Sequence, residues 1–149
     1  MKQGAEEPGR FGIWSEIVIG ACIEVHRHLG PGLLEAVYEE CLCYELSAAG
    51  IAYQRQKVLP VRYLIVGCQL LVELKAMERL RPVHEAQVIT YLKRSGLPVG
   101  LLVNFHAPAI SQGLRRLTNK KISPAPRLPV NPSRGGLKRK IGLVGLRRQ

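Results

Sequence analysis

A short apolar segment that ends in alternating charges, residues 70–76, constrains the fold of this chain more than any other stretch. Its composition and the period-two alternation at its C-terminal end predict a buried β-strand. Successive side chains on a strand point to opposite faces, so Glu73 and Lys75 should share one face and Val72 and Leu74 the other. Burying an acid and a base is costly unless each has a partner, such as the other, a metal ion or a phosphate.

Glu-x-Lys at the end of a strand suits the metal-dependent hydrolysis of phosphodiesters. Glu73 would bind Mg²⁺ through carboxylate oxygens, which this ion prefers. Lys75 would hold or polarise the attacking water and offset the charge that develops on the phosphate. The alternative is a solvated pair on the surface, because charged side chains are mostly exposed. The motif alone leaves both interpretations open.

Length and charge limit the class of protein. The 149-residue chain is most simply one domain with a real core. No apolar run is long enough to span a bilayer and no signal-peptide pattern opens the chain, so we expect a cytoplasmic protein without a membrane partner. The net charge of +11 favours nucleic acid as partner. All eleven acidic residues are Glu, so the chain contains no Asp.

Composition divides the chain into three parts. Residues 1–11 are polar and predict a disordered N-terminus. Residues 12–119 carry the periodic apolar patterns of a folded domain. Residues 120–149 combine prolines with basic clusters, which predicts a disordered tail. This tail would either bind phosphates through counterion release or be an extension without a role.

Within the central part, the patterns predict helices over about 16–29, 33–49 and 82–95. Ser15 is the expected N-cap of the first helix, and Pro82 the first residue of the third. The stripe expected to be buried on the second helix consists of Leu34, Val37, Cys41, Tyr44 and Ala48. On the third helix His84, Gln87 and Tyr91 share a face, which is either a polar surface or part of a site.

The other segments predict strands and turns. Residues 58–63 and 64–66 are rich in β-forming residues, and residues 67–69 predict a turn. Residues 99–105 are nearly all apolar, which is typical of a central strand in a covered sheet. Residues 114–117 predict a short basic turn.

The cysteines lack the spacing of a zinc site and are expected to be reduced thiols in or near the core: Cys22, Cys41, Cys43 and Cys68.

A longer pattern around these residues resembles a known family. Residues 32–38, Gly-Leu-Leu-Glu-Ala-Val-Tyr, resemble the signature of the GxxExxY family, which belongs to the restriction-endonuclease-like PD-(D/E)XK superfamily. The resemblance extends from about Ser15 to Asn119. It includes the segments 23–32, 72–76, 82–87 and 103–105.

This resemblance implies an α/β fold in which helices flank a mixed sheet, with the active site at one end of the central strands. It implies that residues 12–119 form a nuclease-like domain that acts on nucleic acid with Mg²⁺. Glu35 and Glu73 would be the metal ligands, and Glu73 and Lys75 the Glu-x-Lys pair. Gln87 and Tyr91 match the Gln-x-x-x-Tyr motif of exonuclease-like members, and the resemblance implies that they are catalytic residues together with Glu73 and Lys75.

The chain departs from the family pattern ahead of the Glu-x-Lys strand. Members carry more chain there, including an Asp that is a principal metal ligand, whereas Tyr63 runs directly into Leu64 here. An internal deletion of about one strand's length is the simplest explanation. It predicts a sheet that lacks one strand, with an exposed edge or a shifted register, and a lower affinity for Mg²⁺.

These features leave three hypotheses. The first is a metal-dependent nuclease-like enzyme whose activity is impaired by the missing Asp. The second is a catalytically inactive relative that binds nucleic acid through its basic surface and tail. The third is a truncated gene product without a stable function.

Overall fold

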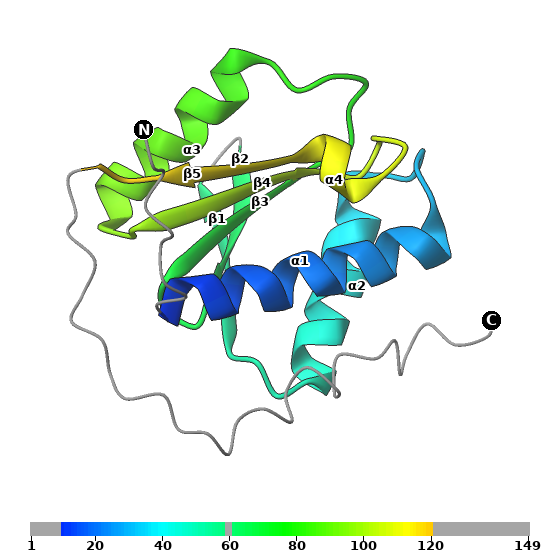
Figure 1. Cartoon of the computed structure of the whole chain (residues 1–149), viewed down its shortest axis with the longest axis horizontal. Coiled ribbons are helices and arrows are strands. Elements are labelled where there is room, and N and C mark those ends of the chain that lie inside the picture. The colour runs from blue at the N-terminus through cyan, green and yellow to red at the C-terminus, as the bar shows by residue number, and fades with distance from the viewer. Residues whose placement is uncertain (1–9, 59–60, 121–149) are drawn as a thin grey trace, which may run out of the picture.

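The computed structural model describes residues 10–58 and 61–120 (Figure 1). Along these residues the elements are α1 (Arg10–Leu29), α2 (Glu35–Ala48), β1 (Tyr53–Val58), β2 (Val61–Val66), β3 (Leu70–Lys75), α3 (Pro82–Ser95), β4 (Val99–Asn104), α4 (Ile110–Gly113) and β5 (Leu114–Thr118). The predicted α/β class is confirmed. The predictions for residues 1–9 and 121–149 lie outside the described residues.

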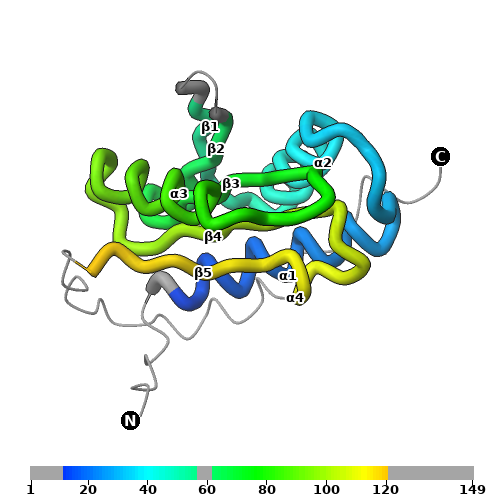
Figure 2. The backbone as a smooth tube through the Cα atoms, turned by 90° about the horizontal axis from the view of Figure 1, so that it is seen from above, coloured from blue at the N-terminus to red at the C-terminus, as the bar shows by residue number. Residues whose placement is uncertain are grey.

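The strands form one mixed sheet in the order β1-β2-β3-β4-β5. The β3 and β4 strands are parallel and are connected through α3, whereas every other neighbouring pair is antiparallel. Strand β2 pairs with β3 only over Leu64–Val66. The β1–β2 hairpin accordingly extends away from the rest of the sheet (Figure 2). The C-terminal half of β3 is therefore paired with β4 alone.

Helices cover both faces of the sheet (Figure 1). Residues of α1 and α2 form one large core with Val72, Leu74 and the alternate residues of β2 and β4 that face the same side of the sheet. Leu71, on the opposite face, belongs to a smaller core with Val88 and Leu92 of α3. The predicted alternation along β3 is confirmed, because neighbouring residues enter different cores.

The apolar stripe predicted for α2 is wrong. The structure buries Tyr38, Leu42, Cys43, Glu45 and Leu46, whereas Leu34 is 77% exposed and Tyr44 is 51% exposed. The helix carries apolar residues on more than one face, so spacing alone did not identify the buried one.

Tyr38 explains which face of α2 is buried. Its ring stacks on Phe105 with centroids 4.4 Å apart. Its hydroxyl donates to the Gly30 carbonyl oxygen at 2.5 Å and accepts from the Leu33 amide at 3.1 Å. Because its polar atom is satisfied, Tyr38 can be fully buried despite its hydroxyl.

Two further local predictions are wrong. Ser15 is not an N-cap, because α1 begins at Arg10 and Ser15 is buried within it. Residues 114–117 are not a turn but part of β5, which pairs antiparallel with β4. Arg115 and Arg116 are exposed on this edge strand, where basic side chains discourage pairing with another chain. Pairing with β4 therefore decided the conformation of this segment, although its basic residues had suggested a turn.

The predicted third helix, the central apolar strand and the turn before β3 are confirmed. Gly96 ends α3 in the left-handed conformation, at φ 68°. Gly67 and Cys68 both have positive φ, as a tight turn between antiparallel strands requires. The Tyr63–Leu64 junction lies inside β2, whose residues all pair with β1, so the sheet is continuous across it.

The four cysteines are free. Cys22 and Cys43 are buried and Cys41 is half-buried, as predicted, but Cys68 is exposed because it lies in the turn after β2. Burial raises the pKa of Cys22 to about 12, so its thiol stays protonated.

Among the described residues, no helix combines the length and apolarity that crossing a membrane requires.

Candidate active site

Strand β3 places Glu73 and Lys75 side by side on the α3 face of the sheet. Glu73 is fully buried, the Lys75 side chain is 14% exposed, and Nζ of Lys75 lies 2.9 Å from Oε1 of Glu73. Opposite them on β4 are Leu102 and Asn104. The two charges form a buried ion pair, so they are not a solvated surface pair.

The carboxylate of Glu73 has no hydrogen-bond donor among the described residues. Both of its oxygens are buried; Lys75 is the ion-pair partner of Oε1, and neither oxygen accepts a hydrogen bond from another group in the part of the chain that the structure describes. Buried carboxylates normally accept several hydrogen bonds, because ionised oxygens are costly to desolvate. Beside Lys75, the Glu73 carboxylate could therefore accept a cation or another ligand.

Glu35, the first residue of α2, is half-buried close to this pair. The pKa of its carboxyl is raised, chiefly by burial. The positive charge of Lys75 lowers this pKa and the negative charges of Glu73 and Glu39 raise it. Arg62 has a smaller lowering effect. These interactions require the groups to be near one another, since screening weakens distant ones. The N-terminal end of α2 thus brings a second carboxylate within electrostatic range of the Glu-x-Lys pair.

Helix α3 contributes Gln87 and Tyr91 to the same face of the sheet. Oε1 of Gln87 is buried and has no hydrogen-bond partner among the described residues. Tyr91 packs on Tyr63 of β2, with ring centroids 5.4 Å apart. Gln87 therefore offers a free buried acceptor on this face, whereas the contact observed for Tyr91 is with another aromatic ring.

Asn104 at the end of β4 was not among the predicted site residues. It is buried; its Nδ2 donates to the Met77 carbonyl at 2.8 Å, and its Oδ1 accepts from the amides of Met77 at 3.1 Å and His106 at 3.2 Å. These bonds fasten the segment that follows Lys75. A polar residue at the end of an otherwise apolar strand was the available sequence signal.

A comparison with family models matches residues 13–117 to the PD-(D/E)XK nuclease superfamily. The chain belongs to this superfamily. No curated protein and no solved structure matches it. The predicted superfamily is confirmed, whereas membership of the GxxExxY family stays a prediction.

The described part of this PD-(D/E)XK domain contains no group of three or more His, Cys, Asp or Glu residues that could hold a metal ion. Glu35 and Glu73 remain as two carboxylates. Mg²⁺ is commonly held by one or two carboxylates, with waters and substrate phosphates completing its shell. The Glu73 carboxylate, which has Lys75 as its ion-pair partner and accepts no hydrogen bond from the described residues, could supply one ligand to such a minimal site.

Proposed function

We propose that the chain is a weakly active, metal-dependent phosphodiesterase that acts on nucleic acid, of the GxxExxY type. The fully buried carboxylate of Glu73, 2.9 Å from the Lys75 ammonium and without a further hydrogen bond among the described residues, carries this proposal. A purely structural ion pair would gain from further hydrogen bonds to its buried oxygens. A carboxylate with few hydrogen-bond partners in the protein is suited to bind a ligand that supplies the missing contacts.

Glu35 and Glu73 would hold Mg²⁺, which when bound polarises a phosphoryl oxygen and lowers the pKa of a bound water. Lys75 would orient the attacking water and offset charge on the phosphate as it develops. Gln87 would position a ligand through its amide. The absence of any Asp leaves fewer protein ligands, and slow turnover and weak metal affinity follow from that.

The test is a cleavage assay on labelled single-stranded and duplex DNA and RNA, with Mg²⁺, Mn²⁺ or EDTA. We expect slow cleavage that EDTA abolishes, and that Glu73→Gln reduces at least about tenfold, the loss of about 1.4 kcal/mol of transition-state stabilisation. Lys75→Ala should abolish it. Absence of cleavage by the wild-type chain with either metal contradicts the proposal.

Glu45→Gln is the matched control. Glu45 is also a buried glutamate whose two oxygens accept no hydrogen bond from any described residue, but the charged groups that act on it are Glu24 and His28. It lies in the core shared by α1 and α2, so the substitution should leave cleavage unchanged. Equal losses for the two variants would mean that the effect is structural.

An inactive nucleic-acid-binding protein is the second candidate, favoured by the missing Asp and the net charge of +11. It predicts salt-sensitive binding without cleavage, which weakens when residues 120–149 are removed. Unchanged binding after that truncation would argue against a role for the tail. A single cooperative thermal transition would argue against the third hypothesis, a truncated product without a stable fold.

A further inference from the structure

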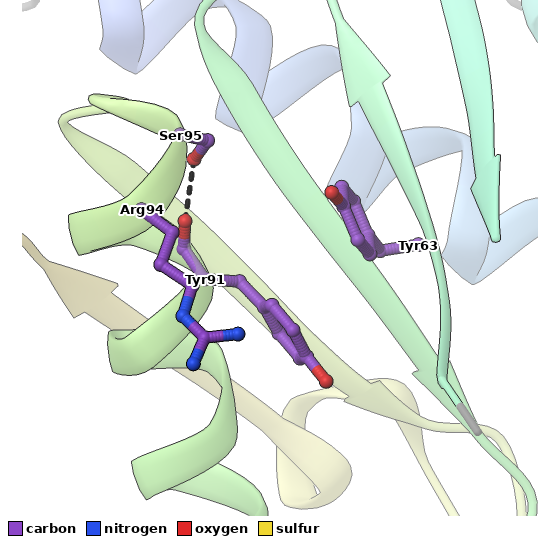
Figure 3. Close-up of a pocket in the computed structure, with 4 residues that line it drawn as sticks. All are labelled: Tyr63, Tyr91, Arg94 and Ser95. Carbon is purple, nitrogen blue, oxygen red and sulfur yellow. Dashed lines mark hydrogen bonds between the residues drawn. The ribbon is translucent and has the colours of Figure 1, made fainter. Parts of the chain in front are cut away.

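Beside the candidate site, four side chains of β2 and α3 line an open hollow of about 180 Å³ (Figure 3). They are Tyr63, Tyr91, Arg94 and Ser95. Of these side chains only Tyr91 belongs to the predicted catalytic residues, whereas Tyr63, Arg94 and Ser95 have no role in the proposed chemistry at Glu73 and Lys75.

The walls of the hollow are two tyrosine rings that come from distant parts of the chain. Tyr63 and Tyr91 lie with centroids 5.4 Å apart and planes 24° apart, in a stacked arrangement (Figure 3). Each side chain is half-buried, at the margin of the small α3 core. Together they present partly exposed aromatic surface, to which a planar, apolar ligand could be added by stacking.

A positive charge adjoins this aromatic surface. Arg94 is exposed in the last turn of α3, and its side chain lies beside Tyr91 (Figure 3). The Ser95 hydroxyl is already engaged, because it donates to the Tyr91 carbonyl at 2.6 Å. Stacked aromatic rings next to an arginine are the combination with which proteins bind the bases and phosphates of single strands.

The hollow lies on the same face of the sheet as the Glu-x-Lys pair. Tyr91 follows Gln87 by one turn of α3. Tyr63 precedes Leu64, whose partner on β3 is Val72, the residue before Glu73. The hollow and the Glu-x-Lys pair therefore lie on the same side of the sheet, where a strand bound at one would be close to the other.

We propose that this hollow binds one unpaired nucleobase of a single-stranded nucleic acid, with Arg94 on an adjoining phosphate. The inference rests on the proposed function for its substrate class. The bases of a duplex are stacked on their neighbours and expose no free face, so a duplex cannot use the site. The occupant is thus a base within a single strand, not paired DNA.

Binding is measured by fluorescence anisotropy in EDTA, with labelled oligothymidylate and an abasic oligonucleotide of the same length. The wild-type chain should bind oligothymidylate more tightly than the abasic strand. Tyr91→Leu should weaken the binding of oligothymidylate about tenfold, which lies within the 1–3 kcal/mol typical of one stacked base. The same substitution should leave the affinity for the abasic strand unchanged. Tyr91→Phe should bind like wild type, because the ring supplies the contact. Tyr44→Leu, at an exposed tyrosine of α2, is the matched control and should change nothing.

Three results would overturn the proposal: equal affinity of the wild type for both strands, no effect of Tyr91→Leu, or equally tight binding of free thymidine monophosphate or of duplex. Should Tyr91→Leu fail to fold, photocrosslinking of a bromouracil-substituted strand to the wild-type chain decides. A crosslink at Tyr63 or Tyr91 supports the site, and crosslinks confined to other residues refute it. EDTA prevents hydrolysis, so the binding assay does not depend on catalytic activity. If the chain binds unpaired bases but does not cleave nucleic acid with Mg²⁺ or Mn²⁺, only the proposed function is contradicted.

Discussion

The two faces of the sheet differ in how completely they are packed. The α1 and α2 face buries a large core centred on Tyr38 and Phe105. The core of the α3 face is small, with five buried residues: Leu71, Val88, Leu92, Leu97 and Leu102. The Glu73–Lys75 ion pair, the buried Gln87 oxygen without a hydrogen bond among the described residues, and the tyrosine hollow occur on the smaller side. The large core supplies most of the buried apolar area, which leaves the other face room for polar groups.

Two buried glutamates sharpen this contrast. Among the described residues, no group donates a hydrogen bond to the carboxylate of Glu45 on α2 or to that of Glu73. Glu73 has Lys75 at ion-pair distance and interacts electrostatically with Glu35, whereas the charged groups that act on Glu45 are Glu24 and His28. Burial alone therefore does not distinguish the two glutamates, whereas the lysine counter-charge on the same strand does.

Removing a large side chain from each face should show which core stabilises the fold. Phe105→Ala should lower the free energy of unfolding by about 4 kcal/mol, and Leu92→Ala by about 3 kcal/mol, because each leaves a cavity. Urea denaturation followed by circular dichroism and by the fluorescence of Trp14, the single tryptophan, measures both. A larger loss for Leu92→Ala would reverse the ranking of the two faces.

Breaking the buried ion pair should cost nearly as much. Lys75→Met leaves the Glu73 charge buried without its partner and should lower stability by about 3 kcal/mol. Adding Glu73→Gln should restore most of that loss. Arg55→Met, which breaks the exposed ion pair with Glu40, is the control and should cost less than about 1 kcal/mol. Equal losses of unfolding free energy in Lys75→Met and Arg55→Met would mean that burial does not increase the contribution of an ion pair to stability.

The close approach of α3 to the sheet gives a smaller effect. A Cβ at Gly100 would lie 2.7 Å from Cγ1 of Val88, so Gly100→Ala should cost about 2 kcal/mol through overpacking. Adding Val88→Ala should relieve part of this cost. Gly20→Ala in α1 meets no atom within 4 Å and should instead be slightly stabilising. A neutral Gly100→Ala in urea denaturation would mean that α3 can shift away from β4.

The smallest effect concerns the pH dependence of stability. Burial raises the pKa of Glu45 above its ordinary value of 4.5; Glu24 raises it further and His28 lowers it. The unfolded chain therefore loses this proton first, and stability falls as pH rises from 4.5 through the folded pKa. Glu45→Gln should be more stable than wild type at pH 7 and equal to it at low pH. Thermal unfolding at several pH values tests this, and a benefit confined to low pH would contradict the sign.

The local patterns predicted most of the elements because tertiary contacts agree with them. Pro82 and Gly96 bound α3 as expected, and the apolar 99–105 segment is a central strand. Predictions were wrong where tertiary structure decided. Arg115 and Arg116 became part of an edge strand, and Tyr38 became the buried residue of α2, since Phe105 and the Gly30 carbonyl supply its partners.

By itself the sequence determined the superfamily, the α/β class, and the shared face of Glu73 and Lys75, because a period of two follows from backbone geometry alone. Only the tertiary structure decided that this pair is buried, that Glu35 lies within its electric field, and that Tyr63 meets Tyr91. Those contacts join residues distant along the chain. They depend on how β2, β3, α2 and α3 pack, and no local pattern encodes that packing.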